Sequence, residues 1–325
     1  MFALLASLAL AGSALAQDPS PLILSVSPGG AYSLASASWP AFSLLGAGVG
    51  LQLDGAWLSS ADGSLLPAAP ARSAPGSDSW GAYNATSIGW ASRAAPSAVL
   101  MTTTFRAYAA APAVGFEAAF PQGLSTGENG TAHKDGVVAS FPTWTLPASS
   151  PLGFLQWAGP FINQGLKGPI TGAFTAPGAD ISAGVAGGPL VLLDASAAAS
   201  VVLSASSEFM AVSAAVLGGG AQLGFGPLGS AAALPAGYAY STVAWQGAGV
   251  NGAVQAWGAA LLAKHGKPHG LSKSDYTNTN LIYNTVRAGG ARTPLRWTDL
   301  TDPLPAAPSL CAGPWRVLLL PDGEL

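Results

Sequence analysis

A series of short apolar or alternating runs, separated by turn residues, constrains the fold of this chain most strongly. Val99–Tyr108 is rich in β-branched and aromatic residues, and residues 114–120 follow after the turn-forming stretch 109–112. In the second run apolar residues alternate with Gly115 and Glu117. A period of two is typical of a strand with one buried face. We therefore predict a hairpin here, with Glu117 on its solvent side.

Similar runs occur on both sides of this hairpin. They are Leu22–Val26 and residues 42–53, 136–141, 189–193, 200–204, 221–225 and 238–245. Many short strands with turns between them indicate a sandwich or a barrel. Their extent, to about residue 247, favours an all-β fold, a large antiparallel β-sandwich of the supersandwich type. The glycine-rich stretch 217–226 has no P-loop lysine, and we interpret it as a turn between strands.

The pattern changes after the last predicted strand. Residues 251–265 have a helical period, with Trp257 and Leu261 on one apolar face. Asn251 is the predicted N-cap and Gly266 the predicted stop. This is the position of a connector to a following domain.

The last part of the chain has no sustained period of either kind and is rich in proline and arginine. We therefore divide the chain into a leader (1–16), a β-sandwich domain (17–248) and a connector helix (249–270). Residues 271–325 are then either the truncated start of a barrel domain or an irregular, aberrant tail.

The N-terminus predicts the compartment. Residues 1–16 are apolar, carry no charge and end in Ala14-Leu15-Ala16, as a secretory signal peptide does. A membrane anchor is the alternative, but the run is shorter than the ~20 residues of a spanning helix. Asn84 and Asn129 each begin an N-glycosylation sequon. We expect a secreted glycoprotein with no membrane association after cleavage of the leader.

Charge and residue counts argue against several classes of ligand. The net charge is −3 with no basic cluster, so nucleic acid and anionic membranes are not expected partners. Cys311 is the only cysteine, which leaves no internal disulfide. His133, His265 and His269 lack accompanying carboxylates, and Pro268 argues against a helix that would join the last two. No metal site and no cofactor are predicted.

Carboxylates and tryptophans are the residues from which a carbohydrate site would be built. Glycosidase chemistry needs two carboxylates flanking the scissile bond, but the acidic residues are scattered singly, and we assign no catalytic residue. Tryptophan rings stack on sugar faces, and they also fill cores. Trp157, which precedes a loop-like segment, is the first candidate for a carbohydrate contact, followed by Trp80 and Trp90.

Four segments in order and spacing carry a family resemblance: residues 116–123, 136–144, 188–210 and 235–266. They resemble the N-terminal part of large secreted glycoside-hydrolase-like proteins of algae, oomycetes and other protists. In these a β-sandwich precedes a barrel similar to those of α-galactosidases and raffinose-synthase-type enzymes. The resemblance implies carbohydrate as the substrate and a barrel domain as an intramolecular partner.

The resemblance weakens after the connector. Residues 275–291 fit the opening segment of such a barrel only loosely, and the barrel strands that would carry catalytic carboxylates do not follow. We therefore weigh three hypotheses: a non-catalytic accessory sandwich of a glycoside-hydrolase-like protein, a stand-alone lectin-like carbohydrate-binding module, and a structural protein without a ligand. An exposed aromatic platform would favour the second, and a bare interface for a missing domain the first. We favour the first.

Overall fold

The structure is a computed structural model that describes residues 21–127, 136–157, 170–176, 181–184, 187–268 and 270. All of them belong to one compact unit. Antiparallel strands dominate these ranges, which contain a single α-helix, α1 (Gly249–Lys264). The predicted all-β class and antiparallel sandwich are confirmed. The predicted leader and the stretch 271–325 lie outside the described residues.

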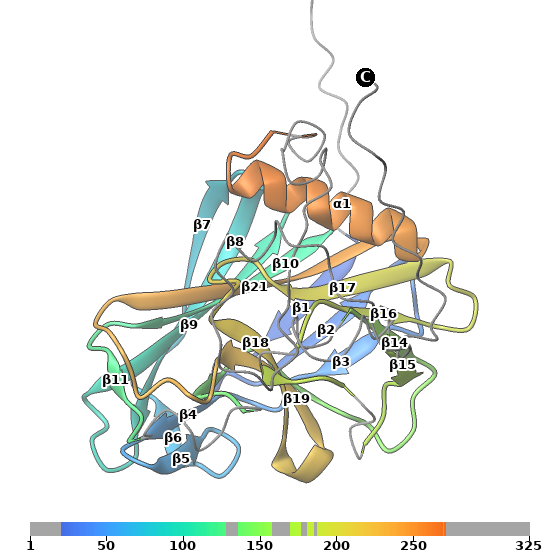
Figure 1. Cartoon of the computed structure of the whole chain (residues 1–325). Coiled ribbons are helices and arrows are strands. Elements are labelled where there is room, and N and C mark those ends of the chain that lie inside the picture. The colour runs from blue at the N-terminus through green and yellow to red at the C-terminus, as the bar shows by residue number, and fades with distance from the viewer. Residues whose placement is uncertain are drawn as a thin grey trace, which may run out of the picture. The chain divides into compact units, whose positions relative to one another are not determined.

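A ten-stranded antiparallel sheet forms the main layer (Figure 1). Its strands are β6 (Leu65–Pro67), β7 (Arg72–Asp78), β8 (Gly81–Ser92), β9 (Val99–Tyr108), β10 (Ala113–Phe120), β14 (Gly153–Gln156), β15 (Ile170–Ala173), β16 (Leu190–Leu193), β17 (Ala199–Ala205) and β21 (Tyr238–Ala248). The order is β15-β14-β16-β17-β21-β10-β9-β8-β6, and β7 pairs with β8 outside this path. β21 pairs with both β10 and β17, so it joins the two halves of the chain.

Four small sheets accompany the large one. They are β1 (Leu22–Val26), β2 (Tyr32–Ser36) and β3 (Ser43–Leu45); β4 (Gly50–Leu53), β5 (Ala56–Ser59) and β12 (Ala139–Ser140); β13 (Thr143–Thr145), β18 (Val212–Leu217) and β19 (Gln222–Pro227); and β11 (Leu124–Ser125) with β20 (Ala233–Leu234). Between β18 and β19 the turn η2 (Gly218–Gly220) has positive φ at each glycine, which glycine adopts without a Cβ clash. The predicted glycine-rich turn is confirmed for residues 218–220, whereas residues 222–226 of the predicted stretch belong to β19 because they pair with β18 and β13.

The core lies between the large sheet and the small sheets, and aromatic rings dominate it. Tyr32 from β2 contacts Phe105 from β9 with ring centroids 5.1 Å apart, and Trp144 from β13 contacts Phe116 from β10 at 5.6 Å. The Tyr32 hydroxyl donates to the Thr143 carbonyl and accepts from the Thr143 amide, each at 2.6 Å. These contacts join the two layers through large buried rings. The Tyr32 hydroxyl is paired, whereas Trp144 Nε1 is buried without a hydrogen-bond partner among the described residues.

The predicted hairpin is confirmed by the pairing of β9 with β10. On β10, Val114, Phe116 and Ala118 are buried against the core. Glu117 points to the other face of the sheet, and its side chain is 31% exposed. The period of two therefore predicted the orientation of this strand correctly.

Two predicted runs differ from the strands observed. Residues 42–53 form two strands, β3 and β4, because the chain turns at Gly48, where φ is 91°. Residues 136–141 contain only the two-residue strand β12, because Ala139 and Ser140 alone pair with β4. The polar hairpin of β7 and β8 was not predicted, since it lacks an apolar run of the kind used to find the others.

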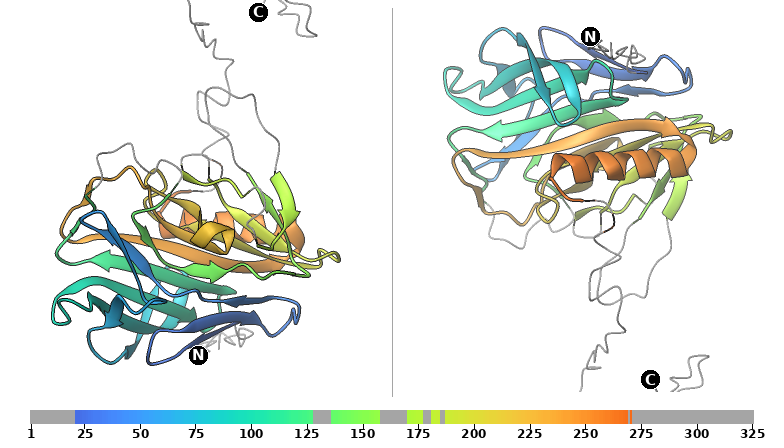
Figure 2. Two further views of the ribbon diagram at one scale, coloured as in Figure 1. Left: turned by 90° about the horizontal axis from the view of Figure 1, so that it is seen from below. Right: turned by 90° about the horizontal axis from the view of Figure 1, so that it is seen from above.

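α1 lies on the outer face of the large sheet, over β16, β17 and β21 (Figure 1). Both views of Figure 2 show the helix running beside β21. In the part of the chain that the structure describes, no helix is long and apolar enough to cross a membrane.

The N-terminus of α1 differs from the prediction, whereas its C-terminus agrees with it. The helix begins at Gly249, and its N-cap is Ala248, so Asn251 is not the N-cap. The reason is the turn out of β21: Gly249 has a φ of 63° and its amide donates to the Ala198 carbonyl, so the N-cap lies three residues earlier than predicted. The C-terminal stop at Gly266 is confirmed, with a φ of 61°.

Candidate functional site

α1 contacts the large sheet through small side chains. Ala253 and Ala260 are its buried residues, and both belong to a cluster with Val202 and Trp245. The backbones of Gly247 in β21 and Ala253 in α1 approach so closely that a Cβ on Gly247 would collide with the backbone of Ala253. Since alanines occupy the contact, the larger apolar residues of α1 lie on a flank that the sheet leaves half-exposed.

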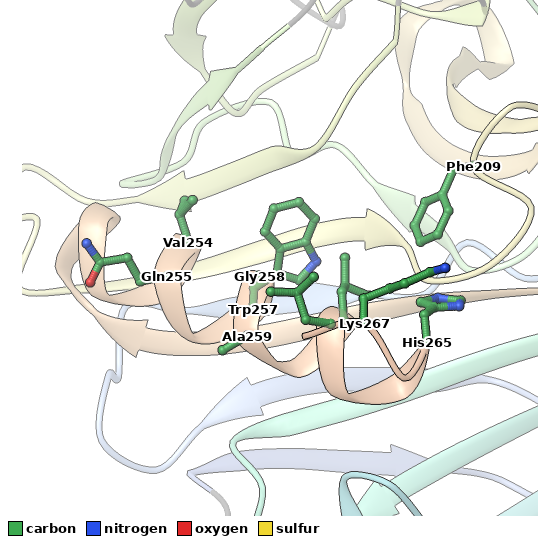
Figure 3. Close-up of a pocket in the computed structure, with 10 residues that line it drawn as sticks. Phe209, Val254, Gln255, Trp257, Gly258, Ala259, His265 and Lys267 are labelled. Carbon is green, nitrogen blue, oxygen red and sulfur yellow. The ribbon is translucent and has the colours of Figure 1, made fainter. Parts of the chain in front are cut away.

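An apolar groove of about 790 Å³ runs along this flank (Figure 3). Its apolar lining comes from Phe209, Val254, Trp257, Leu261 and Leu262. Trp257 and both leucines are half-buried, and Phe209, in the segment between β17 and β18, is 51% exposed. A contiguous apolar surface of this kind on a folded domain marks an interaction site.

His265 closes one end of the groove. Its ring meets that of Phe209 with centroids 5.3 Å apart, and Nε2 lies 3.0 Å from the Ser206 carbonyl oxygen. Figure 3 shows Phe209 across from His265, with Trp257 between His265 and Val254 along the helix. Among the described residues that line the groove none is a carboxylate. The apolar part of the lining suits the burial of an apolar partner.

The last turn of α1 is also attached to Trp80, in the turn between β7 and β8. Lys264 Nζ lies 5.0 Å from the Trp80 ring centroid and donates to Ser206 Oγ at 3.0 Å and to Ser241 Oγ at 2.9 Å. The Trp80 indole N–H donates to the Ala260 carbonyl at 2.8 Å. This contact holds the helix to the edge of the sheet that carries β7 and β8.

The environment of Lys264 disfavours its charge. Burial, and then repulsion from Arg106, lower the pKa of Lys264 to about 8, and the carboxylates of Asp78 and Glu117 offset only part of this. Those carboxylates are engaged elsewhere. Arg106 pairs with Glu117 at 2.7 Å and with Asp78 at 3.9 Å.

Tyr108 completes this network. Its hydroxyl donates to Asp78 Oδ2 at 2.6 Å, and burial together with this hydrogen bond raises the pKa of Tyr108. Each of the two carboxylates thus has a partner on the sheet. We interpret the network as the means by which the polar outer face of β8, β9 and β10 is organised next to α1.

The three predicted tryptophan contacts occupy different environments. Trp90 is only 1% exposed and donates its indole N–H to Thr103 Oγ1 at 2.8 Å, so in this structure its ring belongs to the core. Trp80 is half-buried, with the edges of Tyr108 and Trp245 against its ring. Trp157 is 46% exposed and offers ring surface to a ligand.

The glycosylation and histidine predictions are only partly covered by the structure. Asn84 is exposed on β8, whereas Asn129, His133 and His269 lie outside the described residues. Within the ranges that the structure describes, no group of three or more His, Cys, Asp or Glu could hold a metal ion.

Two exposed aromatic residues were missed. Phe209 follows Glu208 in a segment between strands, and the apolar pair Phe209-Met210 beside an acidic residue was the available signal. Trp57 on β5 is 42% exposed, and its ring lies against the backbone of Gly50, where a Cβ would collide with it. Nothing in the alternation of β5 distinguishes an exposed tryptophan from a buried one.

Among the residues that the structure describes, the fold and the groove together define a β-sandwich domain whose helix bears an apolar groove. No protein-family model matches the chain. No curated protein matches it either.

Several solved structures are similar to the chain at low identity. An α-N-acetylgalactosaminidase from Bifidobacterium bifidum, as a quadruple mutant, is 10% identical with a TM-score of 0.48, over 76% of this chain and 38% of that one. A GH36 α-galactosidase from Geobacillus stearothermophilus in complex with raffinose is 10% identical with a TM-score of 0.41, over 72% and 42%. The chain thus spans less than half the length of these enzymes.

Proposed function

We propose that this domain is the non-catalytic accessory β-sandwich of a secreted glycoside-hydrolase-like protein that acts on carbohydrate. The groove on α1 carries the proposal. Trp257, Leu261 and Leu262 leave apolar surface open on a helix that directly follows the last strand. A domain that worked alone would leave this surface in water, whereas a following domain would cover it.

The partner that the proposal assigns to this groove is a barrel domain. Residues 235–266, which include β21 and most of α1, are among the segments that resemble proteins in which a barrel follows the connector. α1 buries Ala253 and Ala260 against the sheet, and its larger apolar residues at the groove are only half-buried. A connector that serves two domains needs one face for each of them.

The secreted location belongs to the same proposal. It depends on residues 1–16 as a cleaved signal peptide and on glycosylation at Asn84 and Asn129. The exposure of Asn84 on β8 is compatible with an attached glycan.

A stand-alone carbohydrate-binding module is the second candidate. The observation that favours it is Trp157, whose side chain is 46% exposed. Trp80 and Trp90 support it less, because their rings are occupied by Lys264 and by the core.

The mass of the natural protein separates the two candidates. An antibody against the sandwich would be used to recover the protein from culture medium for mass spectrometry of the intact chain and its peptides. We expect a polypeptide much larger than the 32.1 kDa of the present chain, with peptides from a barrel domain. A recovered protein no larger than this chain would contradict the accessory role.

A glycan array tests the second candidate directly. The purified chain would be compared with Trp157→Ala and with Trp57→Ala, a matched control at another exposed tryptophan. Specific binding that only Trp157→Ala abolishes would favour a carbohydrate-binding module over the accessory sandwich. Binding that survives Trp157→Ala would remove Trp157 from the candidate contacts.

A further inference from the structure

A second cavity lies where the segment after β2 meets the ends of β17 and β21, and it shares no lining residue with the groove on α1. Its volume is about 500 Å³, within the range of small-molecule sites. Its lining includes Pro21, Ser38, Trp39, Pro112, Ala198 and Gln246.

Gln246 lines this cavity and has an unsatisfied polar atom in its side chain. The side chain is 5% exposed, and Nε2 donates to Ser38 Oγ at 2.9 Å. Its Oε1 is buried and has no hydrogen-bond partner within the described ranges. Exchanging the two amide atoms would leave a donor unpaired instead. A buried amide atom without a partner is destabilising, so a ligand that supplies a polar group at this wall would be favoured.

Trp39 contributes an aromatic ring to the lining of the same cavity. Its ring stacks on Phe42 with centroids 5.2 Å apart, and its indole N–H donates to Asp194 Oδ2 at 2.6 Å. Hydrogen bonds from Ser196 and then from Trp39 lower the pKa of Asp194, so this acceptor remains ionised. The ring is therefore fixed in orientation beside the cavity.

The remaining residues that line the cavity have flat proline rings or small side chains. Proline rings and the short side chains of Ala198 and Ala199 leave room near the fixed polar atoms, and the lining residues carry no formal charge. A ligand that fits has apolar C–H surface and several neutral hydroxyl groups. We infer that this cavity binds one neutral saccharide unit, with the Gln246 amide and the Ser38 hydroxyl bonding to its hydroxyls. The inference rests on carbohydrate as the ligand class of the proposed function.

Saturation-transfer NMR on the full mature chain tests the inference, with glucose, galactose, mannose and N-acetylglucosamine as probes at millimolar concentration. Gln246→Leu removes the amide, and Ala198→Trp fills the cavity from an exposed position while leaving the amide intact. Gln222→Leu is the matched control, because Gln222 lines a different cavity. We expect transfer from at least one sugar, binding weakened about tenfold or more in both cavity variants, and no change in the control.

Circular dichroism establishes that each variant is folded. No transfer from any of the four sugars to the folded wild-type chain would overturn the inference. So would binding that survives in folded Ala198→Trp, or that only Gln222→Leu or Trp157→Ala removes. None of these results alters the mass measurement that tests the accessory role, so the two proposals fail separately.

Discussion

Trp80 and Ala260 are 180 residues apart in the sequence, and a 2.8 Å hydrogen bond joins the indole N–H of the first to the carbonyl oxygen of the second. The bond links the turn between β7 and β8 to the penultimate turn of α1. The same indole ring receives Lys264, so one side chain attaches the helix to the sheet in two ways. This contact is one of those that hold α1, and with it the groove, on the sheet.

Replacing Trp80 is expected to loosen the C-terminal half of α1. Trp80→Ala should lower the free energy of unfolding by about 3 kcal/mol, because it removes a large half-buried ring together with its hydrogen bond. Trp80→Phe keeps much of the ring contact and should cost about 1 kcal/mol. Urea denaturation measures both, and hydrogen exchange of the amides in 257–264 locates the effect. Equal losses in the two variants would contradict a role for the ring.

Lys264 predicts a specific pH dependence of stability. The folded pKa of about 8 lies below the ordinary lysine pKa of 10.5, so between these two pH values the unfolded chain binds more protons. The contribution of Lys264 to stability is therefore fully present above about pH 10.5 and is lost as the pH falls towards 8. Lys264→Met should reduce this slope in urea unfolding measured across the window. The exposed Lys267→Met is the control and should leave the slope unchanged.

We expect the groove to bind a dye whose fluorescence rises in apolar surroundings. Phe209 lines the groove and is 51% exposed, whereas its neighbour Met210 is 94% exposed and does not line it. Phe209→Ser should lower anilinonaphthalene sulfonate fluorescence at saturating dye, with stability changed by only about 0.5 kcal/mol. Met210→Ser should leave the fluorescence unchanged. Equal decreases in both variants would place the dye elsewhere.

We expect replacement by alanine to have opposite effects on stability at two glycines. A Cβ on Gly226 in β19 would collide with the Ala139 carbonyl oxygen, so Gly226→Ala should destabilise by about 3 kcal/mol. A Cβ on Gly258 in α1 would meet nothing within 4 Å, and Gly258→Ala should stabilise by about 0.5–1 kcal/mol through helix propensity. Thermal unfolding of both variants checks the pair. Similar effects of the two substitutions on stability would show that the backbone around Gly226 can move to accommodate the methyl group.

Glycosylation at Asn84 is expected when the chain is secreted from a eukaryotic host. Asn84→Gln should lower the apparent mass by one glycan, and enzymatic deglycosylation should abolish the difference. Thr86→Ala removes the same sequon without changing the asparagine and should give the same mass. An unchanged mass in both variants would show that the sequon is unused.

The strands that bury one face were predictable because apolar and polar residues alternate along their sequences. β1 and β9 have the predicted bounds, and β10 differs by a single residue. The hairpin of β7 and β8 was not predictable in this way, because Asn84, Thr86 and Ser87 show no apolar alternation. It forms because β9 supplies its hydrogen-bonding partner along the whole edge.

The functional residues were less predictable than the strands. The sequence alone does not distinguish a tryptophan that is buried in the core, as Trp90 is, from one that donates a hydrogen bond to a helix, as Trp80 does. Trp157 alone of the three remains open on one side. The difference lies in contacts over long sequence separations, which local periodicity does not record.

By itself the sequence determined an antiparallel β-sandwich with a helix after its last strand, because periodicity and turn residues act over short range. Only the tertiary structure decided which flank of that helix meets the sheet. Ala253 and Ala260 allow close approach, and Val254, Leu261 and Leu262 remain at the groove. The tertiary structure also placed Gln246 beside Ser38 and Trp39, because strand pairing and the segment after β2 bring distant residues to one cavity.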